Sequence, residues 1–300
     1  MSASPDFPKI PADWSQESEN ILKSKIHAKL WCAPKHNTRR FLFVVHGQGE
    51  QSDRYEHFPF YLASEVDAIG TLDLQGHGKS KGVRGHINNF DQYSEAIIEA
   101  FKWSKALAEK RLGCELEAHW CGHSLGGLIT LRTLLKKHDL KLQSVCVSAP
   151  LLGLALKVPP LKRLFALAVE PFLGSFALAN ELNVEFLSRD PAVGRAYRDN
   201  PLNHAMVSPR FFVQMMREME LMKASMAEFP YNLMMLVPLD DKVVNWKATF
   251  KLFERLKMKS GTKKEMQSFP HFNHEAFNEI GKGRAFNALS SWIRRTSRLF

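Results

Sequence analysis

The sequence is poor in cysteine and carries no disulfide pattern. Its four cysteines stand far apart, at Cys32, Cys114, Cys121 and Cys146. This spacing matches neither a disulfide framework nor a zinc site. Three of the four fall inside apolar runs typical of buried strands, so we expect free thiols in a reducing compartment.

Long apolar runs and a secretory signal are also missing. No stretch of about 18 apolar residues free of charge occurs, which argues against a spanning helix. The first residues, MSASPDFPKIPADW, have neither a basic region nor an apolar one of the kind found in signal peptides. We therefore expect a cytoplasmic protein, with peripheral contact at the inner membrane face as the form of membrane association open to it.

The chain has an excess of positive charge, with a formal net charge of +10. Its basic residues are scattered in short groups such as KSK at 23–25 and RR at 294–295. No zinc-finger, helix-turn-helix or RNA-binding pattern accompanies them, so a nucleic-acid partner is not expected. Two interpretations stay open, a solvated basic surface and attraction to anionic lipid.

Short apolar runs alternate with amphipathic helical patterns, which favours an α/β fold with an open, mostly parallel sheet. The predicted strands are Ile26–Cys32, Phe41–Val45, Ala68–Leu74, Leu116–Cys121, Ser144–Val147, Leu233–Val237 and Glu265–Phe269. The predicted helices are Phe90–Arg111, Leu125–His138, Trp246–Lys257 and Arg284–Arg295.

One region interrupts this alternation. From Leu151 to about Pro230 no strand pattern occurs, which predicts a helical cap inserted over the carboxyl ends of the strands. We therefore divide the chain into a first core part at 1–150, a cap at 151–230 and a second core part at 231–300. Prolines break the apolar stretch Leu151–Ala179, so two short helices are expected there.

Two serines match the G-x-S-x-G pattern of a nucleophile elbow, and their surroundings separate them. Ser124, in GHSLG, follows an apolar run and opens an amphipathic helix. Ser80, in GKSKG, is followed by no helical pattern. An elbow needs a strand, a tight turn and a helix so that the hydroxyl stands exposed at a helix N-terminus. Ser124 is therefore the candidate nucleophile. A phosphate-binding loop at Ser80 is excluded, because Asp73 stands where its first glycine is required.

An oxyanion site is expected beside this serine. The strand FLFVV runs into a loop with glycine on either side of Gln48. Small residues let the backbone approach a substrate carbonyl, so the amides of Gln48 and Leu125 are candidate donors to an oxyanion.

An acid and a base are expected later in the chain, in the order Ser, Asp or Glu, His. The strand NLMMLVP ends near Asp240 and Asp241, and the last strand is followed by His271 and His274. Spacing alone leaves both choices open. The order H-x-x-H-E fits no zinc motif, so no metal site is expected.

Several motifs in succession resemble the monoacylglycerol lipase and lysophospholipase branch of the α/β-hydrolases, also grouped with serine aminopeptidase-like hydrolases. They are HGQGEQSDRY, LDLQGHGKSKG, GHSLGG, SAPLL, LSRDP with NPLNH, DDKVV and FPHFNHE. The likeness implies that Asp241 is the acid and His274 the base. It also implies that Glu50 and Arg54 bind the substrate head group, that no cofactor is used, and that an apolar cap meets a membrane.

The chain departs from this family at two places. Phe277 stands where glycerol-binding members have a further histidine, and Pro238-Leu239 replaces a Gly-Gly pair before the aspartates. The sequence thus predicts a serine ester hydrolase of single-chain acyl lipids that works through an acyl-enzyme. A peptidase or thioesterase on the same three residues, or a non-catalytic binding protein, is the alternative. Four cap methionines are expected to line an acyl tunnel: Met215, Met216, Met219 and Met222.

Overall fold

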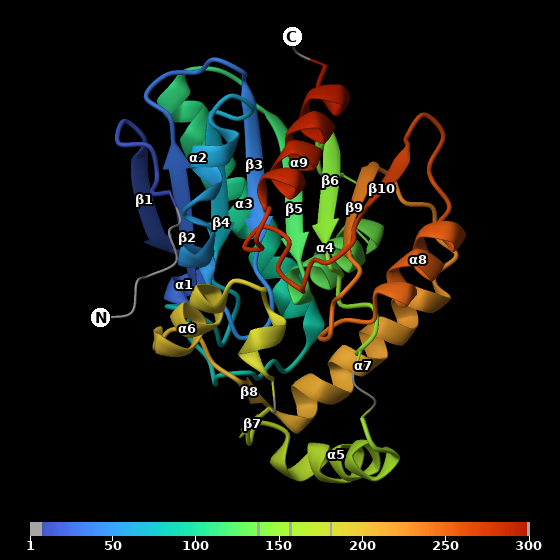
Figure 1. Cartoon of the computed structure of the whole chain (residues 1–300). Helices are drawn as coiled ribbons and strands as arrows, with labels where there is room; N and C mark the ends of the chain where they lie inside the picture. Colours follow the sequence, from blue (N-terminus) through green and yellow to red (C-terminus); the bar gives the residue numbers. More distant parts are fainter. Residues whose placement is uncertain (1–7, 137–138, 156–157, 181, 299–300) are drawn as a thin grey trace.

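A computed structural model describes residues 8–136, 139–155, 158–180 and 182–298. Its centre is an eight-stranded sheet in the order β1-β2-β4-β3-β5-β6-β9-β10 (Figure 1). The strands are β1 Ser15–Asn20, β2 Ile26–Cys32, β3 Arg40–Val45, β4 Ala68–Leu72, β5 Glu117–His123, β6 Ser144–Ser148, β9 Asn232–Pro238 and β10 Lys264–Phe269. From β4 to β10 neighbouring strands run parallel, and β2 lies antiparallel to both β1 and β4. The predicted mostly parallel sheet is confirmed.

The first strand was not predicted. Strand β1, SQESEN, pairs antiparallel with β2 at the sheet edge, and most of its residues are exposed. Because its side chains are polar on both faces, it lacks the apolar run or alternation on which strand prediction depends. The strand is ordered by its pairing with the buried strand β2 and not by a pattern of its own.

Helices cover both faces of the sheet. Successive side chains of β3 point to opposite faces of the sheet. Phe41 and Phe43 belong to one apolar cluster, and Leu42 and Val44 belong to the other. The first cluster takes in α3 Phe90–Leu112, α4 Leu125–Lys136 and α8 Trp246–Arg255, and the second takes in α2 Phe58–Leu62 and α9 Gly283–Thr296. A four-residue helix α1, Ile21–Ser24, precedes β2. The last two residues predicted for the helix at 125–138 lie outside the described residues.

The described part of the segment between β6 and β9 holds three helices, α5 Pro160–Leu173, α6 Pro191–Asp199 and α7 Pro209–Ala224. Figure 1 places them beyond the arrowheads of the central strands. The segment also holds one turn of 3-10 helix and two short strands that pair with each other, η2 Val184–Phe186, β7 Leu178–Ala179 and β8 Met206–Val207. The division of the chain at 150 and 230 into core and cap stays a prediction.

The prediction of two short helices in 151–179 is wrong. Among the residues of this stretch that the structure describes there is one helix, α5, which begins at Pro160 and continues through Pro171 to Leu173. Proline is well tolerated in the first turn of a helix, where its missing N–H has no partner to lose. Pro171 lies inside the helix, where it has no N–H to donate to the Leu167 carbonyl, yet the helix continues for two more residues.

Candidate active site

Ser124 stands at an abrupt corner between β5 and α4. Its backbone φ is +50°, in the left-handed region that side-chain-bearing residues seldom adopt. The chain can turn there because the neighbouring glycines have no side chain. A Cβ on Gly126 would lie 2.3 Å from the Val45 carbonyl oxygen, and one on Gly122 would lie 2.7 Å from the Gly126 carbonyl oxygen. This is the strand, tight turn and helix that the GHSLG pattern predicts.

The structure brings Ser124, His274 and Asp241 together from three separate loops. The distance from His274 Nε2 to Ser124 Oγ is 2.9 Å, and that from His274 Nδ1 to Asp241 Oδ2 is 2.7 Å. The other oxygen, Asp241 Oδ1, accepts the backbone N–H groups of Val243 and Val244, each at 2.8 Å. The aspartate is therefore held in place independently of the histidine, in spite of the Pro238-Leu239 step before it.

The surroundings favour a basic imidazole at His274. Burial would lower the pKa of His274, but the Asp241 carboxylate, with smaller contributions from Glu275 and Glu50, more than offsets this and leaves the pKa above its usual value. The neighbouring ring of His123 lies 4.8 Å away between centroids. Burial and repulsion from His274 lower the pKa of His123 to about 4, so this second imidazole is neutral.

The alternative aspartate and histidine lie elsewhere. His271 Nδ1 is 3.6 Å from Asp240 Oδ2, with 81% of the His271 side chain and 53% of the Asp240 side chain exposed. Ser80 is buried, where its hydroxyl donates to the Asp73 carbonyl and accepts the backbone N–H of His27. None of these residues lines the cavity that holds Ser124.

The loop after β3 lies against the serine. A Cβ on Gly47 would be 3.1 Å from Ser124 Cβ, so only glycine lets this backbone come so close. Within the described part of the chain, the N–H of Gln48 makes no hydrogen bond, and that of Leu125 makes none outside its own helix. Both predicted oxyanion donors are thus available next to Ser124.

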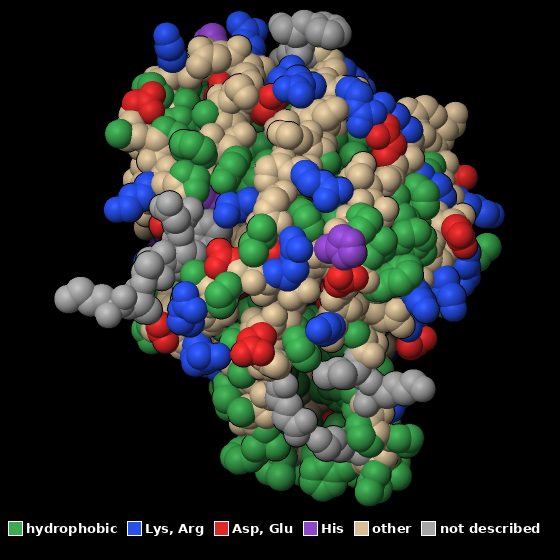
Figure 2. All heavy atoms as spheres, in the orientation of Figure 1, with side chains coloured by type: hydrophobic (Ala, Val, Ile, Leu, Met, Phe, Trp, Pro, Cys, Tyr) green, Lys and Arg blue, Asp and Glu red, His purple; other side chains and the backbone are tan. Residues whose placement is uncertain are grey.

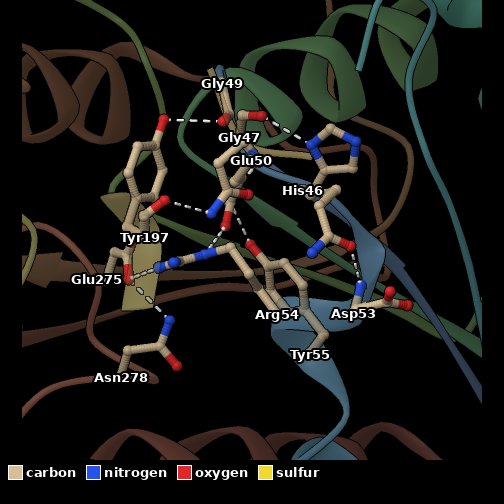
Figure 3. Close-up of polar contacts among 12 residues, drawn as sticks. His46, Gly47, Gly49, Glu50, Asp53, Arg54, Tyr55, Tyr197, Glu275 and Asn278 are labelled. Atoms are coloured by element: carbon tan, nitrogen blue, oxygen red, sulfur yellow. Dashed lines mark hydrogen bonds and ion pairs between the residues drawn. The ribbon is translucent and has the colours of Figure 1, made fainter. Parts of the chain in front are cut away.

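Glu50 and Arg54 lie in a buried polar network beside these groups (Figure 3). Arg54 donates through Nε to Glu50 Oε2 at 3.0 Å and through Nη2 to Glu275 Oε2. Glu50 and Glu275 line the cavity, whereas Arg54 does not. Glu275 was not singled out from the sequence, although it adjoins His274. Its partner Arg54 is 221 positions away, and no local pattern signals a contact at that separation.

The cavity above Ser124 has a volume of about 330 Å³ and is mostly apolar. One group of lining residues comes from the inserted segment and the loops beside it: Leu151, Leu154, Val158, Leu187, Val207, Phe211, Phe212 and Met215. Of the four methionines expected along an acyl tunnel, Met215 is the one that lines the cavity. Met219 and Met222 belong to the buried apolar core, and Met216 is partly buried against that core.

Phe277, which stands in place of the family's further histidine, lies in the core and not in the site. Phe277 is buried among aromatic rings of the core, including Phe58 and Phe286, and does not line the cavity. Across the described ranges, no cluster of three or more His, Cys, Asp or Glu side chains is arranged to hold a metal ion.

Comparisons with known proteins find relatives that match along most of this chain. A family model described as "Serine aminopeptidase, S33" matches residues 36–281. Phospholipase YtpA of Bacillus subtilis is 25% identical over 84% of this chain and 93% of that protein, and human monoglyceride lipase is 23% identical over 87% and 84%. An uncharacterised abhydrolase domain-containing protein of Dictyostelium discoideum is 27% identical over 91% of this chain, which spans 28% of that protein.

Solved structures with a similar fold include two lipases. The monoacylglycerol lipase of Paleococcus ferrophilus superposes with a TM-score of 0.77 at 27% identity, covering 91% of this chain and 99% of that one. A soluble variant of monoglyceride lipase from Saccharomyces cerevisiae, solved with a substrate analogue, superposes with a TM-score of 0.82 at 17% identity, covering 98% and 99%.

Proposed function

Since this chain belongs to the serine aminopeptidase S33 family of hydrolases and has the α/β-hydrolase fold, we propose that it is a serine ester hydrolase of single-chain acyl lipids. The observation that carries this proposal is the hydrogen-bonded series from Ser124 through His274 to Asp241, which opens on an apolar cavity. A hydroxyl, an imidazole and a carboxylate in this order are the groups needed for nucleophilic attack on an ester.

The proposed reaction proceeds through an acyl-enzyme. Ser124 Oγ attacks the ester carbonyl while its proton moves to His274 Nε2, and Asp241 stabilises the resulting imidazolium. The N–H groups of Gln48 and Leu125 donate to the oxyanion of the tetrahedral intermediate. The imidazolium then gives its proton to the departing alcohol. Water, activated by the same imidazole, releases the fatty acid and restores the serine.

The cavity supports an acyl chain as the group held beside the serine. Its apolar wall suits a hydrocarbon chain better than a peptide, whose backbone groups would need hydrogen-bond partners there. A peptidase would also need free carboxylates for an α-amine. Both carboxylates at hand, Glu50 and Glu275, already share Arg54. The names of the relatives, monoacylglycerol lipase and phospholipase, favour monoacylglycerol or lysophospholipid as the substrate class.

The outer face of α5 supports docking on a lipid surface. Leu161, Phe165 and Phe172 are 78%, 64% and 86% exposed. Figure 2 shows apolar side chains gathered at the end of the molecule where Figure 1 places α5. Monomeric soluble proteins seldom expose such a patch unless it meets a partner, and a substrate dissolved in a membrane provides one. The net charge of +10 would add attraction to anionic head groups.

The described residues contain no helix that is both long and apolar enough to cross a bilayer. Peripheral contact through α5 is therefore the form of association proposed, and a cytoplasmic location stays a prediction.

A panel of esters tests the proposed function. Monoacylglycerols, lysophosphatidylcholines and p-nitrophenyl esters of increasing acyl length would be compared, with the Ser124→Ala variant as the blank. We expect turnover of single-chain esters that requires Ser124. If peptides or thioesters were the better substrates, the ester assignment would be wrong. If no substrate were turned over and a fluorophosphonate failed to label Ser124, the hydrolase assignment itself would fall.

A further inference from the structure

Glu50 is buried at the centre of a network that joins two loops of the site. Its Oε1 atom accepts the backbone N–H of Gly47 at 2.6 Å and the hydroxyl of Tyr55 at 2.9 Å. Its Oε2 atom accepts Nε of Arg54 at 3.0 Å. The side chain thus has three donors inside the protein, with 3% of the residue exposed.

Arg54 carries the network on to the base. Its Nη2 donates to Glu275, the residue that follows His274, and its guanidinium lies 5.0 Å from the ring centroid of Tyr197 (Figure 3). Asn278 Nδ2 donates to the same Glu275 oxygen at 2.8 Å. Two carboxylates and an aromatic ring therefore enclose the guanidinium, which is absent from the cavity wall.

The position of the Gly47 carbonyl determines where the N–H of Gln48 points. Leu74 N–H donates to His46 Nε2 at 2.9 Å, so the proton of that imidazole sits on Nδ1 and is donated to the Gly47 carbonyl at 2.7 Å. A trans peptide is planar, with its C=O and N–H pointing in opposite directions. Pinning the Gly47 carbonyl therefore aims the N–H of Gln48 away from His46.

Glu50 restrains the other side of the same residue. A glycine with free φ and ψ would let this peptide rotate, because it lacks the steric limits of other residues. With its N–H held by Glu50 and its carbonyl held by His46, Gly47 is restrained on both sides of its Cα. The Gly49 carbonyl accepts the Tyr197 hydroxyl and the His204 N–H, each at 2.8 Å, so the far side of Gln48 is restrained as well.

We propose that Glu50 is a positioning residue for the oxyanion hole: it holds the Gly47 peptide so that the Gln48 N–H points at the developing oxyanion. Through Arg54 and Glu275 it also fixes the position of this loop relative to His274. This inference rests on the proposed function, and it gives Glu50 a different role from the head-group binding expected from the family resemblance.

The charge of Glu50 fits this role. Burial would raise the pKa of Glu50, but the Arg54 guanidinium and the Gly47 N–H hydrogen bond lower it to about 2. The carboxylate is therefore ionised, and hydrogen bonds to an ionised acceptor are shorter and roughly twice as strong as neutral ones. An amide in its place would have to turn an NH₂ group toward Arg54 or toward the Gly47 N–H.

The Glu50→Gln variant tests the proposal with two esters. p-Nitrophenyl butyrate has no glycerol, and a monoacylglycerol has one. We expect kcat to fall by about 10- to 100-fold on both esters, with KM nearly unchanged, since losing an oxyanion donor outright costs about 10²- to 10³-fold. Affinity for a trifluoromethyl ketone, whose adduct places an oxyanion in the hole, should fall by the same factor as kcat/KM.

Asp53→Asn is the matched control on the same turn of chain. Asp53 pairs with Lys29, and neither residue lines the cavity, so this variant should keep its rate within about twofold. If Glu50→Gln fails to fold in a thermal melt, Glu50→Asp replaces it. The shorter side chain keeps the charge beside Arg54 but withdraws from Gly47, and the same fall in kcat is expected.

A different pattern would overturn the proposal. If Glu50 bound the head group, its variants would raise KM for the monoacylglycerol and leave p-nitrophenyl butyrate and the ketone unaffected. Failure of the proposed function is distinguishable from this outcome, because the unaltered enzyme would then hydrolyse neither ester.

Discussion

Asp241 and His274 meet across 2.7 Å, with 1% and 4% of their side chains exposed. The carboxylate accepts a hydrogen bond from the N–H at Nδ1 of the imidazole, which leaves the lone pair of Nε2 facing Ser124 Oγ at 2.9 Å. The tautomer that a general base needs is therefore set by a partner that is itself held by two backbone amides. Catalysis should depend strongly on this one aspartate.

Replacing the candidate nucleophile should abolish activity. We expect Ser124→Ala to lose at least about a thousandfold in kcat, because residual catalysis comes only from binding and the oxyanion donors. Hydrolysis of p-nitrophenyl butyrate by protein free of other esterases measures the loss. Ser80→Ala is the matched control. It should keep most of the activity but lower the free energy of unfolding by about 1–3 kcal/mol, since it leaves a buried backbone N–H unpaired. Substantial turnover by Ser124→Ala would refute the assignment.

The two neighbouring aspartates should differ sharply. Asp241→Asn should reduce kcat by about 10⁴-fold, the loss seen when the acid of a related catalytic triad no longer sets the tautomer. Asp240→Asn changes an exposed side chain and should alter kcat by less than about threefold. His274→Gln and His271→Gln should show the same contrast. A larger loss at Asp240 or His271 would reverse the proposed roles.

The rate should fall on the acidic side of neutrality. His274 must be neutral to accept a proton, and the Asp241 carboxylate holds its pKa above the usual 6.5. We therefore expect kcat/KM for a soluble ester to rise with pH through a midpoint above 6.5. In Asp241→Asn the attraction is gone and burial still lowers the pKa, so the remaining activity should rise at lower pH. A midpoint that did not move would show that another group controls the profile.

The apolar face of α5 should control membrane binding. We expect the protein to co-sediment with vesicles containing anionic lipid, and to do so less at high salt, because screening weakens attraction between charges. A triple variant with Leu164, Phe165 and Phe172 changed to serine should bind several-fold less. It should keep its rate on p-nitrophenyl butyrate, because none of the three lines the cavity.

The control for this experiment changes exposed apolar residues elsewhere. Phe60 and Ile280, 54% and 55% exposed, lie outside the inserted segment, and their change to serine should leave vesicle binding intact. An unaltered protein that stayed in solution at low salt would refute membrane docking and leave the hydrolase proposal in place.

Much of the sheet was accessible from the sequence because its strands are buried on both faces. Strand β2 was predicted with its bounds as found, since every residue of IHAKLWC lies in the interior. Strand β1 escaped prediction because its polar residues are ordered by a neighbour rather than by their own pattern. The continuous α5 was missed for a different reason, because Pro171 was expected to break the helix, which instead continues through it to Leu173.

The residues of the candidate site also differ in how far the sequence alone predicts them. The tight turn at Ser124 could be predicted because it is local and needs small residues, and its glycines are visible in the sequence. The choice between Asp240 and Asp241 needed family resemblance, since adjacent residues point in different directions only once the loop is folded. The pairing of Arg54 with Glu275 left no local signal, because it depends on how two distant loops pack.

The hydrogen bonds from Tyr197 and His204 to the Gly49 carbonyl also constrain how such proteins can be recombined. Both donors belong to the segment between β6 and β9, yet they hold the loop beside the candidate nucleophile Ser124. A chimera that borrowed this segment from a relative to acquire its substrate range would also exchange residues that hold the candidate site. Swaps that retain the chain from Tyr197 to His204 should therefore preserve turnover, and swaps that cut inside it should not.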